Sequence, residues 1–134
     1  MNEDFVPFEL GVKLKEKGFR EECLCHYIGE DLVYNIESPI ANNQLWFCHN
    51  KYDNIWHRDN VDAPTISQVL KWLRKEYFIH ISTKPYPCED GIMWNYEIRK
   101  FNKNISFVVA NKTGFIKEEQ STLAGIEYIL DYLI

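Results

Sequence analysis

Ile92-Met93-Trp94-Asn95-Tyr96-Glu97-Ile98-Arg99 is the stretch that decides the fold, because large apolar side chains alternate in it with other residues. A period of two is typical of a β-strand with one buried face. The chain is expected to turn at residues 101–104, and Ile105, Phe107 and Val109 continue the alternation. We therefore predict an antiparallel hairpin whose second strand buries these three side chains.

A further strand is predicted just before this hairpin. Residues 78–82 alternate between apolar and polar in the same way, and residues 85–91 follow with two prolines and a glycine. Proline lacks the N–H that a strand donates to its neighbour. We therefore expect the segment 85–91 to break the strand.

Two amphipathic helices flank these strands in the sequence. Thr65 and Gln68 match the capping-box pattern, which predicts a helix that begins there and continues to residue 77. Its apolar stripe consists of Ile66, Val69, Leu70, Leu73 and Tyr77, with Trp72 half covered at the edge. The last helix begins between residues 116 and 122, with a stripe of Ile116, Leu123, Ile126, Leu130, Leu133 and Ile134. Because Tyr128 and Tyr132 widen its apolar surface, we predict a homodimer through this C-terminal helix.

The first part of the chain predicts a helix and a hairpin. Pro7 suits the first position of a helix over residues 7–17, and Gly18 suits the left-handed residue that ends it. The β-rich runs 23–28 and 32–36 are separated by a short segment that contains glycine. They are typical of two paired strands.

Residues 37–63 show no clear period, yet a structureless loop of this length is uncommon in a compact domain. We therefore predict a third strand at 44–49 and a loop at 50–62. The complete order is α-β-β-(β)-α-β-β-β-α. It predicts a single α+β domain over residues 1–134, with helices packed on an antiparallel sheet.

Composition and charge narrow the function classes. The chain has 134 residues, 46% of them apolar, which is enough to bury a core without disulfides or a metal. Its net charge of -5 argues against a nucleic-acid partner, because binding to phosphates needs clustered cations. The sequence has no apolar run long enough to cross a bilayer, and its first residues, Met1-Asn2-Glu3-Asp4, carry two acidic side chains where a signal peptide is basic. We therefore expect a cytoplasmic protein with no membrane partner.

Motifs for catalysis are absent from the sequence. It contains no glycine-rich phosphate loop, no nucleophile elbow and no zinc-protease helix, so we expect no cofactor. Cys23, Cys25 and Cys48 lie near histidines, but their spacing matches no zinc framework, and buried apolar roles are the simpler interpretation.

An enzymatic alternative stays open. A thiolate nucleophile needs a nearby base, so Cys48 or Cys88 paired with His49, His57 or His80 would suit a small hydrolase or transferase. The adjacent carboxylate pairs suggest no such chemistry, because neighbours in a strand point apart.

Aromatic residues outside the regular elements are the candidate binding residues. Trp46, Tyr52, Trp56 and His57 lie in the irregular central segment, and Tyr86 lies between two prolines. Large aromatics beside polar groups are typical of an interface or a ligand pocket, although such rings also form secondary cores. Our leading hypothesis is a non-enzymatic accessory or protein-interaction domain with a protein partner.

Several segments are similar to a known family. They are Phe5-Val6-Pro7-Phe8, Leu14-Lys15-Glu16-Lys17-Gly18-Phe19, Ala63-Pro64-Thr65, Lys71-Trp72-Leu73-Arg74-Lys75-Glu76-Tyr77 and Leu123-Ala124-Gly125-Ile126. Together they resemble a family of small uncharacterised proteins from gut bacteria and their phages or mobile elements. The resemblance implies a phage-related or accessory origin, and it supplies no catalytic residue.

Overall fold

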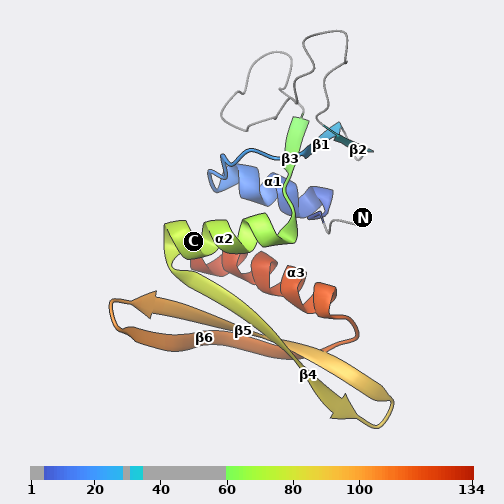
Figure 1. The fold of residues 1–134 in the computed structure, drawn as a ribbon, viewed down its shortest axis with the longest axis vertical. Coiled ribbons are helices and arrows are strands. Elements are labelled where there is room, and N and C mark those ends of the chain that lie inside the picture. Colours follow the sequence, from blue (N-terminus) through green and yellow to red (C-terminus); the bar gives the residue numbers. More distant parts are fainter. Residues whose placement is uncertain (1–4, 29–30, 35–59) are drawn as a thin grey trace. The chain divides into compact units, whose positions relative to one another are not determined.

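The structure is a computed structural model, and it describes residues 5–28, 31–34 and 60–134 (Figure 1). Its elements are α1 (Phe8–Glu16), β1 (Cys25–Ile28), β2 (Asp31–Tyr34), β3 (Asn60–Ala63), α2 (Ile66–Tyr77), β4 (Ile79–Cys88), β5 (Gly91–Asn102), β6 (Ile105–Phe115), α3 (Glu118–Tyr128) and a π-helical turn, η1 (Ile129–Leu133). The α+β class and the predicted element order are confirmed. Contacts within the chain separate it into two compact units, Met1–Ser67 and Gln68–Ile134.

Helix α1 begins one residue after and ends one residue before the predicted range of 7–17. Pro7 is its N-cap, and Gly18 follows its C-cap with a φ of 89°, a left-handed conformation that glycine adopts without strain. The backbone N–H of Phe19 donates to the carbonyl of Leu14 at 3.0 Å, and that of Gly18 donates to Lys15 at 3.1 Å. These two bonds form a Schellman ending, so the local sequence is sufficient to stop this helix.

The sheet of the first unit has the order β2-β1-β3, with antiparallel pairing throughout. Its core consists of Cys25, Tyr27, Val61 and Ala63, against which Phe5, Phe8 and Val12 pack. The Tyr27 hydroxyl donates to the carbonyl of Val6 at 2.6 Å, and its ring meets that of Phe8 edge-on at 5.6 Å. The predicted first hairpin is confirmed by this pairing of β1 with β2.

The predicted loop over 50–62 is wrong at its end, because Asn60 begins strand β3. This strand pairs with β1 in the register Cys25↔Ala63 and Tyr27↔Val61. Its sequence has low intrinsic strand propensity, so pairing with a strand more than 30 residues away, rather than local preference, makes it a strand. The strand predicted at 44–49 lies outside the described residues.

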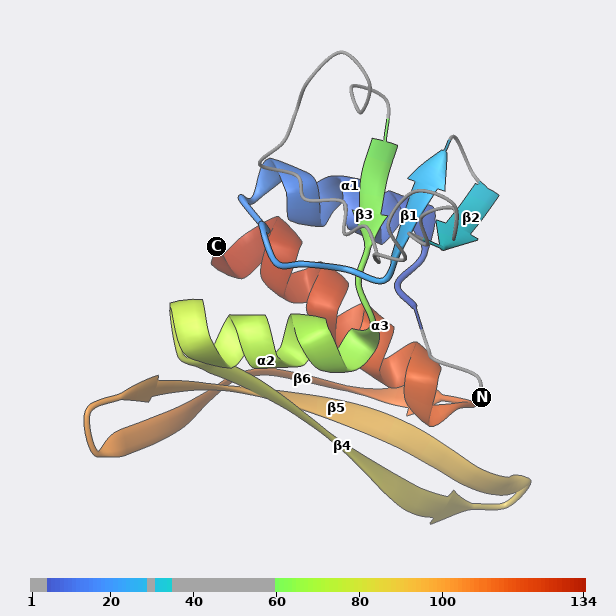
Figure 2. The ribbon, with the colours of Figure 1, turned by 45° about the horizontal axis from the view of Figure 1, so that its top comes forward.

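The second sheet has the order β4-β5-β6, so the strands form two antiparallel sheets rather than one (Figure 2). The predicted break at 85–91 is wrong, because β4 continues through Pro85 and Pro87 to Cys88. The N–H of Lys84 points toward β5, where it donates to Oδ1 of Asn95 at 3.0 Å. The next residue, Pro85, therefore directs its nitrogen away from β5, as does Pro87. A strand at the edge of a sheet tolerates proline at such positions.

The inward face predicted for the long hairpin is confirmed only at its middle. Tyr96 and Ile98 are buried, whereas Ile92, Ile105 and Phe107 are exposed. Both ends of the hairpin extend past α3 (Figure 2). Register shifts between Trp94 and Tyr96 and between Ile98 and Arg99 also interrupt the strict alternation of β6 relative to β5. The alternation therefore gives the strands correctly but overstates how much of them is covered.

The predicted stripe of the last helix is confirmed in part, because Ile126 and Leu130 are buried. The other buried residues of α3 and η1 are Ser121, Thr122, Gly125 and Ile129, while Ile116 of the stripe lies before the helix and is exposed. A Cβ at Gly125 would lie 3.3 Å from Cγ2 of Ile81 and 3.4 Å from Cγ of Tyr96. Small residues therefore face the sheet and allow the helix to lie close to it.

Helix α2 matches its prediction more closely. Val69 and Leu73 of the predicted stripe are buried. Trp72, predicted to be half covered, is only 5% exposed, and its ring lies 5.3 Å from that of Tyr77.

Candidate functional site

Large apolar side chains are exposed together at the end of the β5–β6 hairpin. Phe78, Phe101, Ile105, Phe107 and Val108, here called the hairpin-end cluster, are 62%, 42%, 68%, 46% and 43% exposed. Phe78 belongs to this end of the sheet because its carbonyl accepts the backbone N–H of Phe101 at 2.9 Å. Soluble proteins seldom expose contiguous apolar side chains unless the patch contacts something. The cluster is therefore the candidate site.

The local sequence explains how the cluster is presented. Lys103 and Asn104 form a two-residue turn, and Lys103 adopts a φ of 56°. Two-residue turns are the common connection of a tight β-hairpin, because their backbone twist matches the twist of the two strands. All residues from 101 to 108 are exposed, so the cluster lies on a projecting hairpin end.

The cluster occupies both faces of the hairpin. Phe107 is paired with Lys100, so the two side chains lie on the same face of the sheet. The buried Ile98 lies on this face too, farther along the strand, where α3 covers the sheet. Val108 is paired with Arg99 and therefore lies on the opposite face, as does Phe101. The cluster is thus a wrapped hairpin end and not a flat platform.

The charge around the cluster is positive although the whole chain is acidic. Residues 98–117 contain five lysines and arginines and no carboxylate side chain, against a net charge of -5 for the chain. Nε of Arg99 lies 2.8 Å from Oε1 of Glu97. Within the part of the chain that the structure describes, Lys100, Lys103 and Lys112 form no ion pair and are exposed. Their charge is therefore available to a partner.

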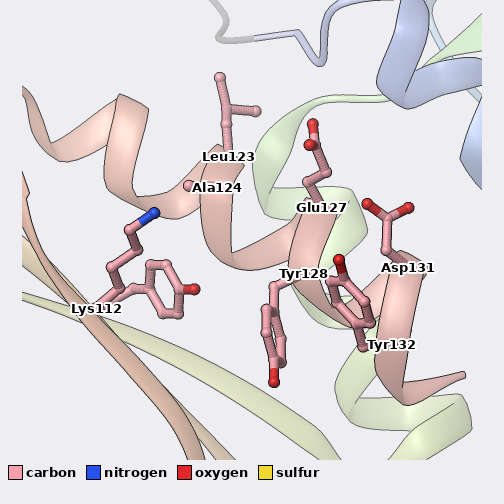
Figure 3. A pocket seen from close by; sticks show the side chains of 8 residues that line it. Lys112, Leu123, Ala124, Glu127, Tyr128, Asp131 and Tyr132 are labelled. Atoms are coloured by element: carbon pink, nitrogen blue, oxygen red, sulfur yellow. The ribbon is translucent and has the colours of Figure 1, made fainter.

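A groove of about 300 Å³ lies between α3 and the sheet of the second unit (Figure 3). It is lined by Tyr96, Lys112, Leu123, Ala124, Glu127, Tyr128, Asp131 and Tyr132. Burial, together with the nearby Tyr128, raises the pKa of the Tyr96 hydroxyl, so it is protonated at neutral pH and acts as a hydrogen-bonding group rather than a base. The rings of Tyr128 and Tyr132 lie 5.0 Å apart. The groove can hold a small polar group beside the Tyr96 hydroxyl.

Four of the five predicted binding residues, Trp46, Tyr52, Trp56 and His57, lie outside the described residues. The fifth, Tyr86, is half-buried in β4, and its hydroxyl accepts the backbone N–H of Gly114 at 2.9 Å. Since Gly114 belongs to β6, this bond ties the two outer strands of the sheet together across β5. Tyr86 therefore has a structural contact, and the binding role of all five residues stays a prediction.

The described cysteines and histidines do not form the pair that the enzymatic alternative needs. Cys88 and His80 are eight residues apart on the continuous strand β4, which separates them by roughly 26 Å. Cys25 and His26 are adjacent in β1, so their side chains point to opposite faces. Burial also raises the pKa of the Cys25 thiol, which disfavours the thiolate. Cys48, His49 and His57 lie outside the described residues.

Metal-ligating side chains do not gather in the part of the chain that the structure describes. Across residues 5–28, 31–34 and 60–134, the structure shows no group of three or more His, Cys, Asp or Glu side chains placed to hold a metal ion. Cys23 and Cys25 are both fully buried, in keeping with the apolar role expected for them. Of the helices in these same ranges, none has the length and apolar character needed to cross a membrane.

The sequence alone missed the hairpin-end cluster, because it assigned Ile105 and Phe107 to a buried face. The run of cations without carboxylates over residues 98–117 was the signal that this hairpin differs from the rest of the chain.

Comparisons with protein-family models, curated proteins and solved structures found no match to this chain.

Proposed function

We propose that the protein is a non-enzymatic accessory or protein-interaction domain, and that the hairpin-end cluster contacts its protein partner. The observation that supports this function is the joint exposure of Phe78, Phe101, Ile105, Phe107 and Val108 at one end of a sheet. Aromatic and aliphatic side chains of this kind form the centre of protein interfaces, where their removal from water provides most of the binding energy.

The geometry favours a protein partner over a small-molecule substrate. The cluster consists of exposed side chains on both faces of a hairpin end, whereas substrate sites are concave and enclose most of their ligand. A phage-related or accessory origin, implied by the resemblance of the sequence, agrees with a binding role. The cytoplasmic location and the homodimer through the C-terminal helix stay predictions beside this proposal.

The test compares two isoleucines of the same hairpin. Ile105 in the cluster and Ile92 at the opposite end of β5 are 68% and 63% exposed, so Ile92→Ser is a matched control for Ile105→Ser. Each variant is used as tagged bait in the native cell, and captured proteins are quantified after chemical cross-linking. Because both side chains are exposed, neither substitution is expected to change the unfolding midpoint appreciably.

We expect Ile105→Ser to lower partner capture at least fivefold, since the loss of one well-placed apolar anchor costs 1 kcal/mol or more, that is, about a factor of five. Ile92→Ser should leave capture unchanged. Equal capture by both variants would refute the proposed use of the cluster. A loss with Trp56→Ser but not with Ile105→Ser would assign the interface to the central aromatic segment instead.

A further inference from the structure

Strand β6 presents hydrogen-bonding groups that no strand of the described residues uses. It is an outer strand of the order β4-β5-β6 and runs for 11 residues without proline. The two-residue turn makes Asn102 and Ile105 a hydrogen-bonded pair, and Lys100 with Phe107 is the next such pair. The N–H and C=O groups of Ser106 and Val108 therefore point away from β5, toward the open edge.

The two edges of this sheet differ in a way that matters for binding. On β4, Pro85 and Pro87 remove the outward N–H groups from part of the edge. Prolines, charges and bulges on an edge strand are the usual means by which proteins prevent a further strand from adding. On β6, the residues from Ile105 to Ala110 carry neither a proline nor a charge, and the pairing with β5 is regular from Ile105 to Val108, before the register shift between Val108 and Ala110. This regular part of the β6 edge is therefore open to a fourth strand.

The surroundings of this edge define the chemistry of its partner. Lys100 and Lys103 lie beside the open part of β6, and residues 98–117 contain no carboxylate. A second copy of β6 would bring these cations close to their equivalents and be repelled, whereas an extended segment with carboxylates would be attracted. Exposed Ile105 and Phe107, which lie on the same face of β6, would pack against the apolar side chains of that segment.

A single-stranded nucleic acid fits this site less well. Stacking of successive bases needs aromatic rings side by side on one face, beside cations. Phe101 and Phe107 lie on opposite faces of the hairpin, so they do not form such a platform.

We propose that the β6 edge binds an extended segment of the partner protein as an added antiparallel strand, and that this segment alternates apolar with acidic side chains. This proposal rests on the proposed function and deepens it. Main-chain hydrogen bonds to Ser106 and Val108 would provide the affinity for the added strand. Contacts with the hairpin-end cluster would favour partner segments that carry apolar side chains.

The probe is a ten-residue peptide of alternating valine and glutamate, labelled with a fluorophore and titrated with the full chain. A peptide of alternating valine and lysine is the charge control. Val108→Pro removes one outward N–H, in the way that Pro85 does on β4, and Val108→Thr is its matched control that keeps this N–H. Amide hydrogen exchange of the unaltered chain is a second readout, which holds even if Val108→Pro fails to fold.

We expect the acidic peptide to bind, with an affinity that falls as the salt concentration is raised. The basic peptide should bind at least tenfold more weakly. Val108→Pro should lower the affinity at least tenfold, and Val108→Thr should change it less than threefold. Exchange at Ser106 and Val108 should slow with the acidic peptide, while exchange at Phe107, whose N–H already faces β5, should stay the same.

Unchanged exchange at Ser106 and Val108, or no binding of the acidic peptide, would overturn strand addition. Equal binding of both peptides, or tighter binding of a single-stranded oligonucleotide, would overturn the partner chemistry. If Ile105→Ser lowers capture in the cell while Val108→Pro does not, the interaction function stands and only this mode fails. If neither variant lowers capture, both proposals fail.

Discussion

Replacement of Gly11 by alanine is expected to destabilise the protein, although the same change stabilises most helices. Gly11 lies inside α1, where alanine is normally favoured by about 1 kcal/mol. A Cβ at this position would lie 3.0 Å from the carbonyl oxygen of Asp62 and 3.0 Å from Cγ1 of Val61. Both distances are shorter than ordinary contacts, and the oxygen belongs to the backbone of β3, which is held by its pairing with β1.

The expected magnitude follows from these opposing effects. Overpacking of a well-packed interior costs about 1–3 kcal/mol. After subtraction of the helix preference, Gly11→Ala should lower the free energy of unfolding by about 1 kcal/mol, or the thermal midpoint by roughly 4 °C. Urea unfolding followed by tryptophan fluorescence measures the effect.

Gly125→Ala is the matched control. The nearest atoms to its Cβ, at 3.3 and 3.4 Å, belong to the side chains of Ile81 and Tyr96, which can shift. Here the helix preference and the packing cost should nearly cancel, to within about 0.5 kcal/mol. Stabilisation of about 1 kcal/mol by Gly11→Ala would show that α1 and β3 do not approach as closely as described.

Three further predictions concern buried polar groups and thiols. Tyr27→Phe should cost about 1–2 kcal/mol in urea unfolding, because it leaves the carbonyl of Val6 without its 2.6 Å bond, and an unchanged midpoint would contradict this. Burial, aided by a nearby arginine, lowers the pKa of His80, whose Nδ1 has no hydrogen-bond partner. The unfolded state therefore binds the proton more readily than the folded state. The folded protein should keep its full stability above about pH 6.5 and lose stability as the pH drops below this value. His80→Gln should reduce this fall, as measured by thermal unfolding from pH 7 to pH 5, and an identical fall in both proteins would refute the assignment. Exposed Cys88 should react with iodoacetamide in the folded protein, while buried Cys25, with its raised pKa, should react only after unfolding. Peptide mass spectrometry measures the order of labelling, and labelling of Cys25 before Cys88 would contradict the burial of Cys25.

The elements that the sequence predicts well are those whose signals are local. The end of α1 depends on Gly18 and on the backbone bonds from Gly18 to Lys15 and from Phe19 to Leu14, so a short segment contains all the information. Helix α2 and the β5–β6 hairpin likewise carry their period and turn within one stretch of chain. The α+β class followed from these elements alone.

The elements that were mispredicted depend on distant partners. Pro85 and Pro87 predict a break because the sequence does not show that β4 is an outer strand, whose outward nitrogens face no other strand of the described residues. Strand β3 has little propensity of its own and exists because β1 offers a pairing surface. Sequence patterns give the face of a strand, but they do not give the length of the helix that covers it.

The sequence by itself thus determined the helices, the hairpins and the alternating faces of this protein. Only the tertiary structure decided that Ile105 and Phe107 are exposed, because α3 covers the middle of the sheet and the hairpin extends past it. It also decided that β4 and β6 are the outer strands of their sheet, and that Pro85 and Pro87 remove outward N–H groups from β4, whereas Ser106 and Val108 keep theirs on β6. Exposure and edge position are relations between distant parts of the chain, and a one-dimensional pattern cannot contain them.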